Sequence, residues 1–302
     1  IANCLVGSEM CIRDRPMIGE FVSQVGGENI NLTVLMPPEA NPHTYEPAPQ
    51  DAGTIAEADL VFYTGLLYEP AALVKLLENS ACSTDILSEV GESVFPIEFK
   101  EGGHDDHDDH DDEEGHDDHD DEEGHDDEEG HDDEEGHDDH EGHNHGAYDP
   151  HFWFDPSRVA YAAEYIESRL IQFDPENESS YISSADSFVS ELNDLTKQVS
   201  ELISTVPSQN RKLITTHESL GYLEAKFGLE VLSTIIPSLN SANEISPSDL
   251  AGVIDVIEDN NVKVIFIESE APSVYSETIV AETGIKPVTG LYVETLKPGQ
   301  SY

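Results

Sequence analysis

"YISSADSFVSELNDLTKQVSELIS", residues 181–204, is the stretch that decides how the rest of the chain can be arranged. Its apolar side chains recur at steps of three and four residues, with no proline or glycine between them: Ile182, Ala185, Phe188, Leu192, Leu195, Val199 and Leu202. This spacing places them on one face of an α-helix about six turns long. With its flanks the pattern predicts one helix of about 28 residues, which would span about 40 Å.

Short apolar runs alternate with helical patterns on both sides of this helix. The runs have the character of strands and lie at residues 30–37, 60–65, 212–217, 229–237 and 262–269. They are mostly apolar on both faces, as parallel strands covered by helices are, and the alternation predicts an α/β fold. We therefore expect two α/β lobes with parallel sheets, residues 16–174 and 208–302, joined by one long rigid helix, residues 175–207. A shorter helix packed wholly inside one domain is the alternative.

Residues 1–15 do not follow this alternation. "LVGSEMCIRDR" (5–15) has neither the apolar alternation of a strand nor a clean helical face, and it closely resembles the translation of a sequencing-library adapter. We therefore treat residues 1–15 as an adapter scar and leave them out of the fold prediction. A genuine N-terminal arm is the alternative.

The chain is strongly acidic, with a formal net charge of −52 over 302 residues. Residues 101–146 hold 26 of the 65 acidic residues and no Lys or Arg, so the remaining residues carry 39 acids against 13 basic groups. Such a charge repels phosphate backbones and anionic lipid surfaces. It excludes nucleic acid as a partner and favours cationic ligands. No run approaches the ~18 apolar residues of a membrane-spanning helix.

Eleven of the 14 histidines lie in this acidic tract: His104, His107, His110, His116, His119, His125, His131, His137, His140, His143 and His145. The tract has no aliphatic or aromatic residue, so burial cannot offset the entropy of ordering it, and we expect a disordered loop within the first lobe. Its imidazoles and carboxylates predict several weak metal sites, and its negative field concentrates cations. We interpret it as an accessory metal-collecting loop. A solvated acidic spacer without a metal role is the alternative.

The other three histidines have more specific surroundings. His43 follows the predicted strand 30–37, His151 lies between prolines in "YDPHFWFDPSR", and His217 ends the predicted strand 212–217. Open α/β sheets bind ligands at the carboxyl ends of their strands. A single histidine is more often structural than a ligand, but three neutral imidazoles are a familiar protein contribution to a zinc site. Together they predict a metal site.

Four stretches that include these histidines carry a family resemblance. They are "GGENINLTVLMPPEANPHTYEP" (26–47), "DPHFWFDPSR" (149–158), "LITTHESLGYLEAKFGLEV" (213–231) and "IFIESEAPS" (265–273). The chain from Pro16 to Tyr302, apart from the acidic tract, resembles the cluster A-I solute-binding proteins, the metal receptors of zinc and manganese ABC importers.

This resemblance implies two α/β lobes joined by one long helix, with the ion buried in the cleft between them. His43 and His151 would come from the first lobe and His217 from the second. It also implies a location in the periplasm or on the outer face of the cell membrane, and an ABC permease with its ATPase subunit as partner of a monomeric receptor. Compared with the family, the first strand is missing and the second lobe is truncated at its end.

The fourth ligand position departs from the family. Many relatives have Asp before an "SY" or "TY" near the C-terminus, where this chain has Gln300, a poorer ligand for a hard cation. Water or Gln300 could complete the site, and Glu218 and Glu268 are the candidate carboxylates, with second-layer hydrogen bonding as their expected role. Manganese-type relatives tend to have Glu in place of His217. Three imidazoles without an added carboxylate favour Zn²⁺ over Mn²⁺.

We therefore expect an extracytoplasmic solute-binding protein that captures zinc and delivers it to an ABC permease. One alternative is a receptor of the same type for manganese or another divalent metal, and another is a metal-storage protein that acts mainly through the acidic tract. Three histidines and a water also describe a catalytic zinc hydrolase. The sequence has no HExxH, G-x-S-x-G or GxxxxGK[ST] motif, so we expect no enzymatic activity and assign ATP hydrolysis to a partner subunit.

Overall fold

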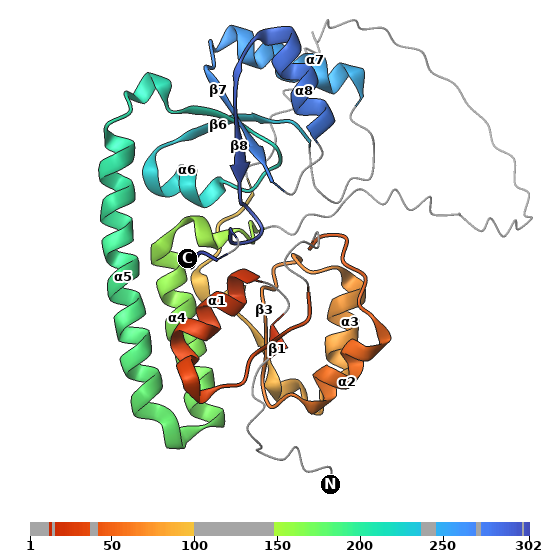
Figure 1. The fold of residues 1–302 in the computed structure, drawn as a ribbon, viewed down its shortest axis with the longest axis vertical. Helices are drawn as coiled ribbons and strands as arrows, with labels where there is room; N and C mark the ends of the chain where they lie inside the picture. The colour runs from red at the N-terminus through yellow and green to blue at the C-terminus, as the bar shows by residue number, and fades with distance from the viewer. Residues whose placement is uncertain are drawn as a thin grey trace, which may run out of the picture. The chain divides into compact units, whose positions relative to one another are not determined.

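The structure of the protein is a computed structural model (Figure 1). It describes residues 12–13, 16–36, 42–99, 148–236, 246–269, 273–297 and 299–302. These residues belong to one compact unit made of Ile1–Phe99 and His145–Tyr302. The acidic tract and its eleven histidines lie outside the described residues. Among the helices that the structure describes, none combines the length and the hydropathy needed to cross a bilayer.

The first sheet has four parallel strands in the order β2-β1-β3-β4. They are β1 (Ile12–Arg13), β2 (Thr33–Val34), β3 (Val61–Tyr63) and β4 (Leu87–Glu89). Strands β2 and β3 lie within predicted strands. Strand β1 corrects the fold prediction, which left residues 1–15 out, because Ile12 pairs with both Thr33 and Val61 at the centre of the sheet. A strand of two residues carries no alternation that a sequence pattern could reveal.

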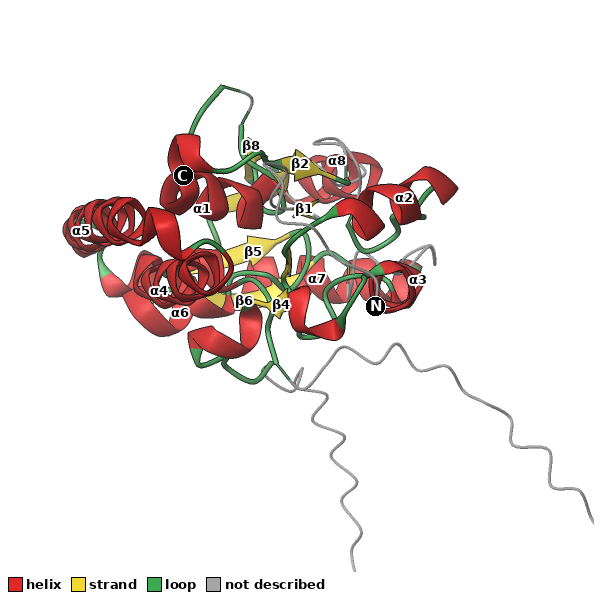
Figure 2. Ribbon diagram, turned by 90° about the horizontal axis from the view of Figure 1, so that it is seen from below, coloured by secondary structure: helices red, strands yellow, loops and turns green. Residues whose placement is uncertain are grey.

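Helices cover both faces of this sheet (Figures 1 and 2). They are α1 (Pro16–Gly26), α2 (Pro49–Glu57), α3 (Ala71–Ser80) and α4 (Pro156–Phe173), with 3-10 turns at Gly27–Asn29, Thr84–Ile86, Gly91–Val94, Phe152–Phe154 and Pro175–Asn177. Adjacent residues of a strand point to opposite faces. Phe62 accordingly packs in the core with α1 and α4, whereas Val61 packs in a separate core with α2 and α3.

The long helix predicted from the apolar spacing is confirmed as α5 (Glu178–Ser204), 27 residues in length. Its first half packs against α1 and α4 through Tyr181, Ala185, Phe188 and Leu192, all buried. Beyond them the apolar face is partly exposed, and Leu202 is 70% exposed. The helix is therefore anchored on the first lobe and extends from it to α6 (Gly221–Phe227) of the second lobe.

The second sheet has four parallel strands in the order β6-β5-β7-β8. They are β5 (Lys212–Thr215), β6 (Glu230–Thr234), β7 (Val264–Glu268) and β8 (Lys286–Leu291), with helices α6, α7 (Pro247–Asp259) and α8 (Ser273–Thr283) and a 3-10 turn at Ser208–Asn210. The three strands predicted here are confirmed. Strand β8 was missed because it is mostly exposed and contains Pro287 and Gly290.

The start of α4 fixes the segment that carries His151. Asp155 is the N-cap residue, its side chain accepts a hydrogen bond from the backbone N–H of Ser157, and Pro156 occupies the first helical position. A capping carboxylate and a proline at this position both favour helix initiation. The chain before α4 therefore turns sharply at 152–154, next to the predicted ligand.

Candidate metal centre

The three histidines predicted as ligands lie together, and a fourth residue joins them. His43, His151, His217 and Glu294 each offer one ligand atom, and these atoms all lie within 4.8 Å of one another. His43 lies between β2 and α2, His151 precedes the turn at 152–154, and His217 follows β5. Glu294 lies three residues after β8. Both residues of the second lobe thus follow parallel strands at their carboxyl ends, where open α/β sheets bind ligands.

Glu294 is central to the group. Its Oε1 lies 3.1 Å from Nε2 of His43, 3.3 Å from Nε2 of His151 and 3.1 Å from Nε2 of His217. In a tetrahedral site with Zn–N bonds of about 2.0–2.1 Å, neighbouring ligand atoms are about 3.3 Å apart. The three distances are close to the three edges of such a tetrahedron that meet at the carboxylate oxygen. All four ligand atoms lie within 4.8 Å of one another, so one divalent cation could bind them together once the side chains adjust.

Nε2 of His217 supplies a further sign of a cation site. It is buried and lies 3.1 Å from Oε1 of Glu294, but the two atoms do not meet the geometry of a hydrogen bond. A buried polar atom without a hydrogen bond carries a free-energy cost that a ligand can remove. The lone pair of a neutral imidazole at this position would be satisfied by a metal ion.

Carboxylates orient two of the imidazoles. Nδ1 of His151 is 2.8 Å from Oδ1 of Asp149, and Nδ1 of His217 is 2.7 Å from Oε2 of Glu268. A neutral imidazole that donates its Nδ1–H to a carboxylate keeps its Nε2 lone pair for a metal, and such a partner fixes the ring. The structure places Glu268 in the hydrogen-bonding role expected from the sequence.

Tyr68 holds the second oxygen of the Glu294 carboxylate. Its hydroxyl donates a hydrogen bond of 2.6 Å to Oε2 of Glu294, and its ring meets that of His43 edge to face at 5.1 Å. Tyr68 ends a tight loop in which Leu66 and Leu67 have positive φ angles of 55° and 59°. Such angles are costly for residues with a side chain.

Two acidic side chains stabilise this loop. The carboxylate of Glu69 accepts hydrogen bonds from the backbone N–H groups of Thr64 and Gly65, and the carboxylate of Glu89 accepts one from Leu66. The loop conformation is therefore fixed by hydrogen bonds, and Tyr68 reaches Glu294 from a rigid base.

The centre concentrates negative charge in a buried space. Asp149, Glu268 and Glu294 are at most 3% exposed. Burial lowers the pKa of His217, but the hydrogen bond to Glu268 and the charges of Glu268 and Glu294 outweigh burial and raise the pKa to about 10. The pKa of His151 is also raised, because Glu294 and Asp149 outweigh the effect of burial. The carboxylates are thus balanced by protons on the imidazoles or by a bound cation.

The structure does not bring the other suggested fourth ligands into this group. Gln300 is exposed, and its backbone N–H donates to the carbonyl of Lys297. Glu218 is partly buried, with a pKa raised mainly by burial, and is not one of the four. The sequence left the fourth ligand open, and the carboxylate that joins the three imidazoles in the structure is Glu294, which was not among the candidates. Its place in "YVETL", just after an unrecognised strand, was the signal that sequence reasoning missed.

Comparisons with known proteins agree with this geometry. The family model for the zinc-uptake complex component A, periplasmic (ZnuA), matches residues 15–302. The manganese-binding lipoprotein MntA of Halalkalibacterium halodurans is 21% identical over 282 residues, which are 93% of this chain and 77% of that protein. The high-affinity zinc uptake system protein ZnuA of Bacillus subtilis is 27% identical over 272 residues, or 88% of this chain and 73% of that protein.

Solved structures share the fold. The periplasmic zinc binding protein TroA from Treponema pallidum superposes with a TM-score of 0.76 at 19% identity, over 97% of this chain and 92% of that one. A crystal structure of ZnuA has a TM-score of 0.71 at 23% identity, over 94% of this chain and 91% of that one. The prediction of two α/β lobes with parallel sheets is thereby confirmed.

Proposed function

The chain belongs to the zinc-uptake complex component A family, and from this premise we propose that it captures zinc outside the cytoplasm and delivers it to an ABC permease. Family and relatives identify it more coarsely as a metal-binding receptor of an ABC transporter, and not as an enzyme. The relatives carry the names of both zinc and manganese, so the choice of metal needs its own argument.

The donor set at the centre is the observation that supports zinc. Three imidazole nitrogens and one carboxylate oxygen converge on one point in a largely buried space. Borderline-soft Zn²⁺ suits imidazole, whereas Mn²⁺ prefers carboxylate, carbonyl and water oxygens. The sequence argument for zinc included the absence of a carboxylate, and that part is corrected by Glu294. The remaining three-to-one excess of nitrogen donors over oxygen donors still favours zinc.

Membership in the family supports the proposed partners and location. We propose that the receptor works as a monomer on the outer side of the cytoplasmic membrane and docks on a permease whose ATPase subunit supplies the energy. Relatives are named as lipoproteins or as periplasmic proteins. The chain itself has no GxxxxGK[ST] phosphate-binding loop. ATP hydrolysis therefore belongs to a partner.

The acidic tract is proposed as an accessory collector for the buried centre. Its eleven histidines and 26 acidic residues would bind several ions weakly and raise the local cation concentration. The alternative, a storage protein in which the tract does most of the binding, makes a different prediction. The described residues on either side allow a clean test, since Glu98 and Tyr148 form an antiparallel bridge. The tract can thus be replaced by a short Gly-Ser linker without separating them.

A metal competition experiment on two proteins tests both proposals. Zinc and manganese affinities are measured with a chromophoric chelator for the full chain and for a variant in which residues 101–146 are replaced by the linker. We expect one tight zinc site in both proteins, much weaker manganese binding, and a lower total stoichiometry in the variant. Tighter binding of manganese than of zinc contradicts the zinc proposal. Loss of the tight site with the tract favours storage.

A further inference from the structure

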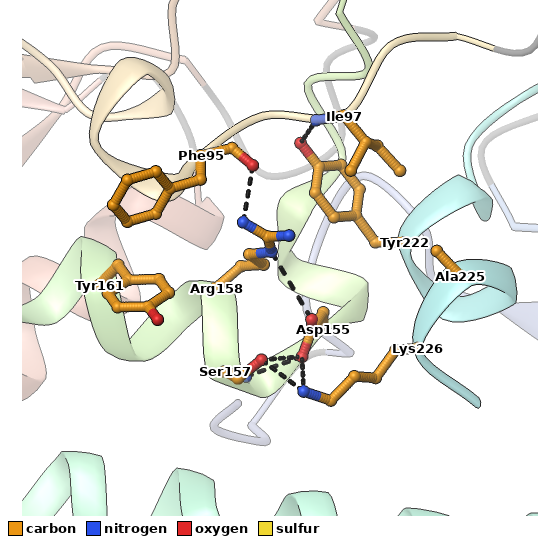
Figure 3. A pocket seen from close by; sticks show the side chains of 9 residues that line it. All are labelled: Phe95, Ile97, Asp155, Ser157, Arg158, Tyr161, Tyr222, Ala225 and Lys226. Atoms are coloured by element: carbon orange, nitrogen blue, oxygen red, sulfur yellow. Dashed lines mark hydrogen bonds and ion pairs between the residues drawn. The ribbon is translucent and has the colours of Figure 1, made fainter.

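A pocket outside the metal centre brings the two lobes together next to α6 (Figure 3). Ile97 and Tyr161 line it from the first lobe, and Tyr222 and Lys226 line it from the second. Nζ of Lys226 donates to Oγ of Ser157, and these two groups connect α6 with the start of α4. Tyr222 lies deeper. It is 1% exposed and packs in the hydrophobic core of the first lobe, although α6 belongs to the second.

The hydroxyl of Tyr222 is inserted into a backbone pair of the first lobe. Ile97 and Asp149 face each other, next to the antiparallel bridge of Glu98 and Tyr148, and the N–H of Asp149 donates to the carbonyl of Ile97 at 2.8 Å. The second hydrogen bond of this pair, from Ile97 to Asp149, is replaced by two hydrogen bonds through the Tyr222 hydroxyl. The N–H of Ile97 donates to the Tyr222 hydroxyl at 3.2 Å, and this hydroxyl donates to the carbonyl of Asp149 at 2.8 Å. One side chain of the second lobe thus completes a ladder of the first.

The side chain of Asp149 also lies against the second lobe. Its Oδ1 accepts hydrogen bonds from both the backbone N–H and Nδ1 of His151, at 2.9 and 2.8 Å. A β-carbon placed on Gly221, the first residue of α6, would lie 2.6 Å from Oδ2 of Asp149. No side chain larger than hydrogen fits there without moving this carboxylate. Helix α6 therefore bonds to the main chain of Asp149 through Tyr222, and the lack of a side chain at Gly221 leaves the space that the Asp149 carboxylate occupies.

We propose that Tyr222 and Gly221 are positioning residues for the metal centre, which hold Asp149 from the second lobe so that it orients the His151 imidazole of the first. The inference rests on the proposed metal-receptor function. It adds that His151 is in its binding orientation only while α6 is seated on Ile97 and Asp149. Apposition of the lobes thereby controls a ligand that neither Tyr222 nor Gly221 touches.

The first test removes the inserted hydroxyl. Tyr222→Phe keeps the ring in the core but leaves Ile97 N–H and the Asp149 carbonyl without their bridge. Partners that orient a metal-binding histidine are typically worth about 10–100-fold in affinity, and we expect a loss of about tenfold in zinc affinity by chelator competition. Tyr161→Phe is the matched control, because Tyr161 lines the same pocket, whereas the two backbone groups bond to the hydroxyl of Tyr222. It should bind zinc as the parent does.

The second test adds a methyl group. Gly221→Ala should push the Asp149 carboxylate away from its position and weaken zinc by a similar factor. Gly252→Ala in α7 is its control, because a β-carbon on Gly252 meets nothing within 4 Å. Nitrogen-15 NMR of the histidine rings separates positioning from general loosening. In both test variants the Nδ1–H signal of His151 should shift, whereas that of His217 should stay.

The outcomes are distinguishable from failure of the metal-receptor proposal. If the parent itself binds zinc no better than free imidazole does, the proposed function fails. If the parent binds tightly and Y222F and G221A both bind within twofold of it, the positioning inference is wrong. Equal shifts of the His151 and His217 signals would also overturn it, since they would indicate loosening of the whole molecule.

Discussion

His151 and His217 present the same ring nitrogen to the same carboxylate oxygen, but the structure supports them in different ways. Glu268 ends β7, next to β5 in the sheet, and uses both of its oxygens on His217, one for Nδ1 and one for the backbone N–H. Its own N–H donates to the Thr216 hydroxyl. Asp149 precedes His151 by two residues in one loop and uses a single oxygen for both contacts.

The difference shows where rigidity at the centre comes from. His217 is oriented by a neighbouring strand of its own sheet, so its support is complete within the second lobe. His151 is oriented from its own loop, which is hydrogen-bonded to Tyr222 of the other lobe and whose Asp149 carboxylate fills the space left by Gly221. We infer that the second lobe presents its ligand in a preformed geometry, whereas the first lobe presents His151 correctly only when the lobes are together.

Removal of a ligand should have the largest effect on this comparison. His217→Ala takes away one of four ligand atoms and leaves the Glu268 carboxylate buried beside a cavity. Zinc affinity should fall by more than about 100-fold, beyond the range for loss of an orienting partner. Isothermal titration with a competing chelator measures it. His131→Ala in the acidic tract is the control and should leave the tight site unchanged. Affinity within threefold of the parent would refute the role of His217.

Replacing each orienting carboxylate by its isosteric amide should show how much Glu268 and Asp149 each contribute to zinc binding. Glu268→Gln replaces one acceptor oxygen with an NH₂ group that faces a buried donor on His217, so one of two hydrogen bonds is lost. Asp149→Asn can keep Oδ1 for both contacts. At one fixed pH we expect E268Q to weaken zinc binding by about 10–100-fold and D149N by about tenfold or less. A larger loss for D149N would reverse our view of which support is stronger.

The pH dependence of zinc affinity should show the protons that the ion displaces. In the metal-free protein the pKa of His217 is raised to about 10, because the effects of Glu268 and Glu294 outweigh the lowering by burial. Affinity should therefore fall as pH falls from about 10, by about tenfold per pH unit for each displaced proton. The ordinary histidine pKa of about 6.5 would place the fall lower. Titrations in buffers of different ionisation enthalpy count the protons, and a flat profile between pH 7 and 9 would contradict this.

The smallest effect is expected for the stability of the metal-free protein. Its free energy of unfolding should fall as pH rises, whereas zinc affinity should rise with pH. The folded pKa of His217 lies above the unfolded value of about 6.5. Its protonation therefore stabilises the fold fully below about 6.5, and this contribution is lost as pH rises to about 10. Urea unfolding of chelator-treated protein should give a lower free energy of unfolding at pH 9 than at pH 7. E268Q should reduce this difference, and an increase with pH would be inconsistent with the raised pKa.

Sequence patterns predicted those parts of the fold that depend on side-chain spacing. The apolar repeat from Ile182 to Leu202 identified α5, and strands such as β5 and β7 stood out as continuous apolar runs. The pattern could not show that α5 packs by only its first half, because the repeat continues to Leu202 whether or not anything covers it. Strand β8 is mostly exposed, so backbone pairing with β7 defines it without any apolar signal.

The same limit explains what was missed at the centre. Three histidines were conspicuous because the rest of the folded chain has no other, whereas Glu294 is one of 65 acidic residues. Glu294 can be distinguished from the other acidic residues only by its position just after the carboxyl end of a strand. That strand is β8, which the sequence patterns did not reveal. Tyr68 and Asp149 are likewise identified by distances that join residues far apart in the chain.

The single helix α5 that joins the two lobes has a consequence for the release of the metal ion. An unbroken helix of 27 residues, without proline or glycine, resists bending far more than a pair of flexible crossovers would. A wide separation of the two lobes would therefore cost much free energy. Coordination bonds, however, lose their strength within a fraction of an ångström, so a slight tilt of one lobe on this stiff rod would be enough to break the ring of ligands and free the ion.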